Sequence, residues 1–225
     1  MGLFSFLKKK PAAQAAPSGN PYQEEAINFI YNLLFCDNPD LFRENTQNPG
    51  AYPFAILLSG TSTVAELQQV IDDPAAEPRV KVLAYNRQRA IGHNPPEKIL
   101  LGVIVEVGLD EGLDVLASFS NGTARYINHT AKIIAWEKED DTVNQLTREL
   151  FAHSQEIVNR IGLWDKPRRP APAKGQLRIS FLLSGGLSFG EGPADVMFSD
   201  PMAAPALTSA TYLMKYLIDQ SAKEQ

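Results

Sequence analysis

The sequence predicts an α+β fold: a mainly antiparallel sheet of five or six strands, built around a central meander, with helices packed on it. The β-rich middle of the chain, residues 99–137, contains the hairpin signal Asn121-Gly122. Apolar residues at helical spacing lie on both sides of it, within residues 27–34 and 142–161. The alternative is a mixed sheet in which Phe54–Leu58 or Leu177–Leu183 runs parallel to a neighbour.

The first twenty residues are expected to be a basic, apolar tail and linker, and residues 21–225 a single α+β domain. Pro11–Gly19 is rich in Pro, Ala, Ser and Gly and lacks large apolar side chains, which is typical of a linker. The first helix is expected to begin near Asn20 and Pro21, because Gln23 completes a capping box there.

Four further signals lie before the meander. Asp37-Asn38-Pro39 ends the first helix and begins a short second one. The apolar run Ala51–Leu58 predicts a buried strand, and Thr63 with Glu66 predicts a capped helix. Residues 79–91 fit a strand or a helix that ends at Gly92, and the helix is preferred.

The meander is expected to have four strands, with one long helix after it. This helix covers Thr142–Ile161, with Asp140 and Asp141 at its positive end and Gly162 at its C-cap. The strands are expected at Ile99–Val107, Leu113–Ser120, Thr123–Asn128 and Lys132–Glu137.

The proline-rich segment at residues 165–175 is interpreted as an excursion from the domain. About fifty residues follow it, too few to bury a core of their own. The strand Leu177–Leu183 is therefore expected to rejoin the main sheet, and a terminal helix is expected over Ala203–Gln220.

Composition argues against several classes of function. The formal net charge is −5 although residues 1–10 contain three lysines and no acids, so no general nucleic-acid binding is expected. The only cysteine is Cys36, which fits a reducing, cytoplasmic location, and no apolar run is long enough to span a bilayer. His93, His129 and His153 have no metal-ligand spacing, so neither a metal nor a cofactor is expected.

Two segments are candidate ligand sites. In the third strand and its turn, Arg125, Asn128 and His129 could bind an anion or act as acid and base, or could simply make turn hydrogen bonds and an ion pair. After the strand at 177–183, a glycine-rich segment could bring backbone N–H groups to a ligand, or could be a hairpin followed by Asp200 as a helix cap. Its candidate residues are Gly185, Gly186, Gly190, Glu191 and Gly192.

The tail is a candidate docking segment. Its apolar and basic side chains suit a membrane surface or a partner protein, and a third possibility is that the tail has no role. The residues concerned are Leu3, Phe4, Phe6, Leu7, Lys8, Lys9 and Lys10.

Two sequences, ARYINH at Ala124–His129 continuing into KIIAWE, and GGLSFGEGP at Gly185–Pro193, resemble those of an uncharacterised group of bacterial proteins of similar length. The resemblance runs from about Val80 to the C-terminus. It implies a bacterial, cytosolic protein, and it transfers no catalytic residue because the group has no established activity.

Two functions therefore remain open. The leading hypothesis is a non-enzymatic binding or scaffold module with a protein partner, self-associating or recruited through its tail. The other is a ligand-binding protein or enzyme in which the hairpin at 125–129 and the glycine segment at 185–192 form one pocket.

Overall fold

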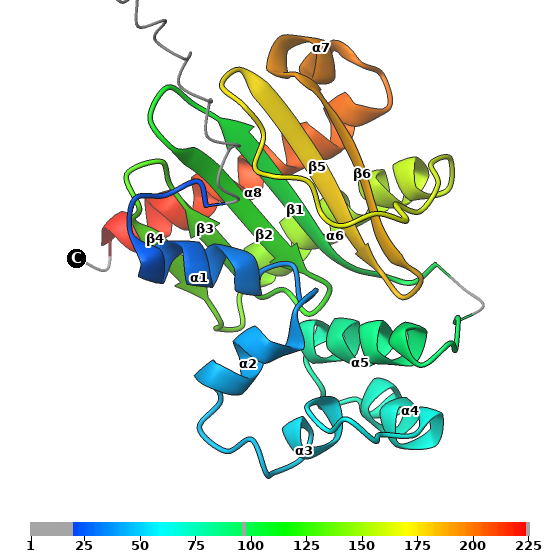
Figure 1. Ribbon diagram of the computed structural model, residues 1–225. Helices are drawn as coiled ribbons and strands as arrows, with labels where there is room; N and C mark the ends of the chain where they lie inside the picture. The colour runs from blue at the N-terminus through cyan, green and yellow to red at the C-terminus, as the bar shows by residue number, and fades with distance from the viewer. Residues whose placement is uncertain (1–19, 96–97, 224–225) are drawn as a thin grey trace, which may run out of the picture.

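The computed structural model describes residues 20–95 and 98–223, so the tail with its candidate docking residues lies outside the described residues. It contains one open six-stranded antiparallel sheet in the order β4-β3-β2-β1-β5-β6, with helices on both faces (Figure 1). The predicted α+β class is confirmed, and the mixed-sheet alternative is not what the structure shows. The strands are β1 (Leu100–Gly108), β2 (Leu113–Phe119), β3 (Ala124–Ile127), β4 (Ile133–Trp136), β5 (Gln176–Leu183) and β6 (Gly186–Pro193).

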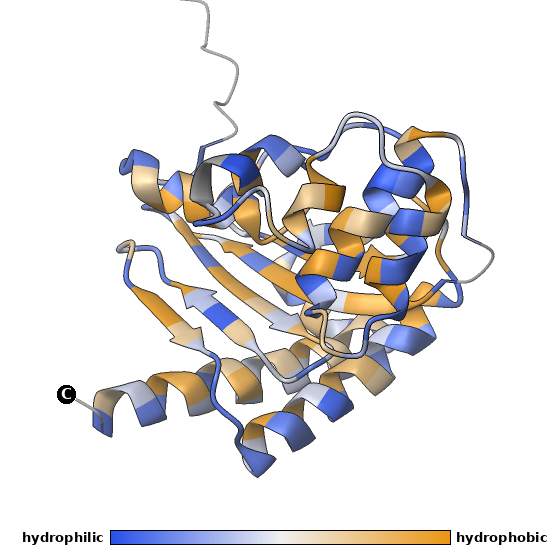
Figure 2. Ribbon diagram, turned by 90° about the horizontal axis from the view of Figure 1, so that it is seen from below, coloured by the Kyte–Doolittle hydropathy of each residue, from blue (hydrophilic) through white to orange (hydrophobic). Residues whose placement is uncertain are grey.

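The sheet separates two apolar cores (Figure 2). Helices α6 and α8 pack together and cover one face, and the helices of the N-terminal half cover the other. The helices are α1 (Glu25–Leu33), α2 (Pro39–Asn45), α3 (Phe54–Leu57), α4 (Val64–Asp72), α5 (Pro78–Ala90), α6 (Asp141–Val158), α7 (Ala194–Ser199) and α8 (Ala203–Lys223). No helix of the described part is both long and apolar enough to cross a bilayer.

Side-chain caps explain the starts of four of the eight helices in the described part of the chain. Thr63 and Glu66 form the predicted capping box of α4, and Asn38 caps α2 by accepting from the N–H of Asp40. Asp140 accepts from two N–H groups at the start of α6, and Asp200 does the same for α8. The preferred helical reading of residues 79–91 is confirmed as α5, which is followed by Gly92 at a φ of 83°.

Three local predictions were wrong. Ala51–Leu58 is not a strand but contains the helix α3, because a short apolar run has no periodicity to distinguish the two. The first helix begins at Glu25 and not near Asn20, and the predicted capping box does not form. Instead, the Asn28 side chain hydrogen-bonds to the backbone N–H and C=O of Tyr22. The long helix α6 ends at Val158, before the expected cap at Gly162.

The turn at Asn121-Gly122 joins β2 to β3, but with three residues instead of two. The Phe119 N–H donates to Thr123, and of the loop residues only Gly122 has a positive φ, of 84°. This is a type I turn with a glycine bulge, in place of the predicted turn with two positive φ angles.

The proline-rich excursion returns the chain to the same sheet, as predicted. Strand β5 pairs antiparallel with β1 over seven residue pairs, beginning with Leu100 opposite Leu183. A two-residue turn, Ser184-Gly185, then leads into β6, the sixth strand. We name the segment of residues 164–173, which crosses from the end of α6 to β5, the strap.

Candidate functional site

The predicted hairpin residues are held within the sheet and its turn. Arg125 is only 8% exposed, donates to the carbonyls of Ala124 and Trp136, and forms an ion pair with Glu137. Burial is the main reason that its pKa lies below the ordinary arginine value. Arg125 therefore has its partners within the meander and is not aimed at a cavity.

Asn128 and His129 shape the turn between β3 and β4. The Asn128 side-chain oxygen accepts from the N–H groups of Thr130 and Lys132, 3.0 and 2.9 Å away. Asp114 accepts from the His129 N–H at 2.7 Å and lies 3.1 Å from its ring Nδ1. These contacts are those of a satisfied turn.

The glycine segment is a hairpin and not a loop. Gly190 and Gly192 lie within β6, and Met197 of α7 packs over the space where their side chains would be. Glu191 forms ion pairs with Arg178 and Arg169. Gly185 and Gly186, at the turn, line a cleft.

The two segments do not meet. Strands β2, β1 and β5 lie between β3 and β6, and four inter-strand spacings correspond to roughly 19 Å. The cleft lined by Gly185 and Gly186 contains no residue of 125–129, and the cleft lined by His129 contains no residue of 185–192. The reason is that β5 pairs with the edge of β1 that faces away from the meander.

A different site is centred on the strap. A cleft of about 860 Å³ lies between the strap, the end of α1, α5 and the β5–β6 turn; we name it the strap cleft. Its polar and aromatic lining residues are Asn32, Phe35, Asp37, Asn38, Asn86, Arg89, Trp164, Asp165, Lys166 and Arg168.

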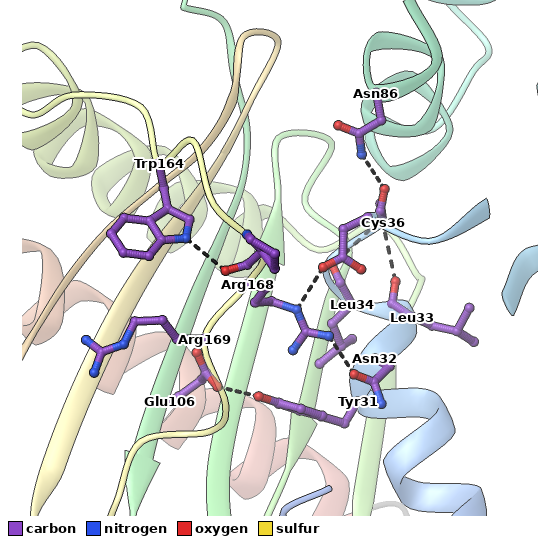
Figure 3. A network of polar contacts seen from close by, with 12 residues as sticks. Tyr31, Asn32, Leu33, Leu34, Cys36, Asn86, Glu106, Trp164, Arg168 and Arg169 are labelled. Atoms are coloured by element: carbon purple, nitrogen blue, oxygen red, sulfur yellow. Dashed lines mark hydrogen bonds and ion pairs between the residues drawn. The ribbon is translucent and has the colours of Figure 1, made fainter. Parts of the chain in front are cut away.

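Arg168 fastens the strap to α1 (Figure 3). Its guanidinium donates to Asp37 at 2.8 Å and to Asn32 at 2.5 Å, and it lies 4.0 Å from the centre of the Phe35 ring. An arginine that is both ion-paired and stacked on an aromatic ring loses little freedom when a ligand binds beside it. Arg168 therefore forms one fixed wall of the cleft.

Arg178 fastens the strap to the sheet. This residue of β5 is 3% exposed and donates to the strap carbonyls of Pro170 and Arg169, at 2.6 and 3.3 Å. It also donates to Glu191 and lies 3.6 Å from Glu106 of β1. The buried guanidinium of Arg178 thus holds the strap against the sheet.

Glu106 is a fully buried carboxylate beneath the strap. The Tyr31 hydroxyl donates to its Oε1 at 2.6 Å, and its Oε2 has no hydrogen-bond partner among the described residues. Burial raises the pKa of Glu106, and Arg178 and Tyr31 oppose that rise. Glu106 lies under the strap and is not among the residues that line the cleft.

Trp164 is a second fixed side chain of the cleft. Its indole N–H donates to Pro167 at 2.9 Å, and its ring meets Phe189 edge to face with 5.0 Å between the centroids. Its backbone N–H donates to Leu187 of the edge strand β6 at 2.7 Å. In Figure 3, the side chains of Trp164 and Arg168 both extend from the strap.

Arg89 differs from Arg168 because its hydrogen-bond partners are neutral. Its guanidinium donates to the Ser184 carbonyl at 2.8 Å and to the side-chain oxygen of Asn86, both of which are neutral. It is partly buried, and this burial lowers its pKa. Among the described residues, no ion pair joins Arg89 to a carboxylate. Gly186, at a φ of 133°, lies beside the guanidinium: a Cβ atom there would be 3.7 Å from Arg89 Nη2.

The remaining charges also favour an anion. The lining contains three cations, Arg89, Lys166 and Arg168, and two carboxylates, Asp37 and Asp165. Asp37 is already paired with Arg168, and neither Asp37 nor Asp165 forms an ion pair with Arg89. A partly desolvated cation attracts an anion more strongly than a solvated one.

The one cysteine of the chain, Cys36, is not among the residues that line the strap cleft. Cys36 is fully buried, its Sγ faces the carbonyls of Leu33 and Leu34, and burial raises the pKa of its thiol. Within residues 20–95 and 98–223, no three His, Cys, Asp or Glu side chains are placed to share a metal ion.

Comparison with family models, with curated protein sequences and with solved structures gave no match. The candidate site therefore depends on its geometry alone.

Proposed function

We propose that the protein is a binding protein that takes a small acidic ligand, a carboxylate or a phosphate, in the strap cleft. The observation that carries this proposal is the guanidinium of Arg89, which is partly buried and, among the described residues, donates only to neutral oxygens. Burying a charge without an opposite charge is costly, and a bound anion removes that cost.

The walls of the cleft support a small ligand over a large partner. Arg168 and Trp164 are each fixed by at least two contacts, so the cleft is preformed. A volume of about 860 Å³ lies in the range of small-molecule sites. The backbone of the turn Ser184-Gly185 lies against the Arg89 guanidinium. This arrangement favours a ligand that places its charged end beside Arg89.

Two other expectations stay proposals. A cytoplasmic location follows from the single cysteine and from the lack of an apolar run that could span a bilayer. Docking through Leu3–Lys10, to a partner or to a membrane surface, concerns residues outside the described part of the chain.

The proposal predicts that Arg89→Gln strongly reduces stabilisation by acids. Thermal unfolding of the full chain would be followed with phosphate, pyrophosphate, succinate, citrate and a nucleoside monophosphate. At a hundred times its Kd, a ligand stabilises the folded state by about 2.7 kcal/mol. Losing one charge-assisted hydrogen bond weakens affinity about 10-fold to 100-fold in Arg89→Gln.

The matched control is Arg148→Gln, which removes one positive charge from the exposed face of α6. If the effect of Arg89→Gln is local to the cleft, acids stabilise Arg148→Gln as much as they stabilise the wild type. Equal responses of Arg89→Gln and the wild type, or a panel in which no acid stabilises the wild type, would contradict the proposal.

A further inference from the structure

The two edges of the sheet differ in how they are protected. At the β6 edge, the backbone of Trp164 bonds Leu187, and Pro193 ends the strand. At the β4 edge, the strand Ile133–Trp136 has no such cover: no described residue outside the sheet hydrogen-bonds to the backbone of Ile133 or Ala135. In Figure 1, β4 lies at the outer side of the sheet beside the C-terminal end of α8.

The turns fix which β4 groups face outward. The N–H of Asn128 donates to Lys132, so these two residues form a hydrogen-bonded pair. Pairs alternate along an antiparallel ladder, so Ile134 and Trp136 bond to β3, while the N–H and C=O groups of Ile133 and Ala135 point away. The turn before β3 agrees, because the Phe119–Thr123 bond directs Arg125 and Ile127 toward β2.

The outward N–H and C=O groups of β4 lie along a groove. A groove of about 310 Å³ follows β4 from Ile133 to Lys138 and is closed on one side by Ser221 of α8. Ala135 is exposed, and Ile133 and Ile134 are half-buried. The strand contains neither proline nor a charged residue, the usual protections of an edge.

We infer that β4 pairs antiparallel with β4 of a second copy of this chain, about a two-fold axis at Ile134. With Ile134 opposite its own symmetry mate, the outward groups of Ile133 face those of Ala135 of the partner subunit. Both residues of each such pair then exchange two hydrogen bonds.

The side chains also fit a second copy. In this register, Ile134 meets Ile134 of the partner subunit on the α8 face. Lys132 lies opposite Trp136 of the partner subunit, and Ala131 opposite Glu137 of the partner subunit. No two like charges stand directly opposite each other, which a self-pairing edge requires. An isologous interface of this kind closes at two copies and leaves the covered β6 edges outside.

A cysteine at the axis tests the register. Directly opposite residues that are not hydrogen-bonded have Cα atoms about 4.5 Å apart, within the range of a disulfide. Under mild oxidation, Ile134→Cys should form a covalent dimer in most molecules, whereas Tyr212→Cys, on an exposed position of α8, should not. The native Cys36 does not interfere, because it is fully buried.

Sedimentation of the full chain tests the dimer itself. The wild type and Ala135→Thr, which keeps the backbone N–H, should sediment as dimers at tens of micromolar. Ala135→Pro should be monomeric with an unchanged circular dichroism spectrum, because the N–H it removes points away from β3.

A monomeric wild type, a dimeric Ala135→Pro, or cross-linking of Ile134→Cys no faster than that of Tyr212→Cys would overturn the inference. If Ala135→Pro does not fold, the cross-linking rates and the wild-type sedimentation decide it. These readouts do not depend on the strap cleft, so this inference and the proposed function can fail separately.

Discussion

Replacing Arg178 with methionine is expected to lower the free energy of unfolding by about 3–5 kcal/mol. Methionine fills much of the same space, but it removes the cation that lies between Glu106, Glu191 and the two strap carbonyls. Glu106 is fully buried and would be left with Tyr31 as its only partner. Urea unfolding of the variant and the wild type measures the difference.

Two further variants separate the buried charge from the other contacts. Arg169 forms an ion pair with the same Glu191, but its side chain is half exposed, so Arg169→Met should cost less than about 1 kcal/mol. Adding Glu106→Gln to Arg178→Met should restore part of the lost stability, because the uncompensated charge is gone. An Arg178→Met variant as stable as Arg169→Met would contradict this account of how the strap is held.

Replacing Gly108 with alanine is expected to displace the strap and to cost about 1–3 kcal/mol. A Cβ atom at Gly108 would lie 2.1 Å from the carbonyl oxygen of Ala173 and 2.7 Å from that of Pro172. Both are backbone atoms, so no side-chain rotation relieves the contact. The Gly175 N–H also bonds Gly108 at 2.9 Å, which holds the chain at this crossing.

The matched control is Gly162→Ala, where a Cβ atom would meet nothing within 4 Å. That variant should be as stable as the wild type or slightly more so, because alanine reduces the freedom of the unfolded chain. Denaturant unfolding compares the two, and limited proteolysis reports whether the strap is released. Equal stability and equal cleavage of both variants would show that the strap does not depend on Gly108.

The sequence predicts the meander well because its signals are local. Asn121-Gly122 and the alternation of Arg125 and Ile127 with Ala124 and Tyr126 depend only on neighbours in the chain. The failed strand at Ala51–Leu58 shows the limit of this reasoning, since four to eight apolar residues fit either structure.

Strand β6 was not predicted, because Gly186, Gly190, Gly192 and Pro193 all disfavour strands. What makes it a strand is its pairing with β5, together with Met197, which fills the space beside two of those glycines. The hairpin reading that the sequence left open describes the structure, as does Asp200 as the cap of α8.

The candidate site was beyond reach of sequence reasoning for a similar reason. Trp164 follows the predicted helix with no motif around it, and Arg89 lies near the end of α5, also with no motif around it. These two residues line one cleft only because β5 joins the sheet beside β1 and carries the turn at Ser184 to the end of α5. The pairing of β5 with β1 therefore brings the residues of the cleft together.

The most direct measurement is a titration of the isotope-labelled full chain with phosphate and with succinate, followed by proton–nitrogen correlation spectra. The anion-binding account predicts saturable shifts of the Arg89 side-chain N–H and of the Gly185 and Gly186 amides, with Gly190 and Gly192 unchanged. Saturable shifts centred on Arg125–His129 instead, or none at Arg89 with either anion, would contradict it.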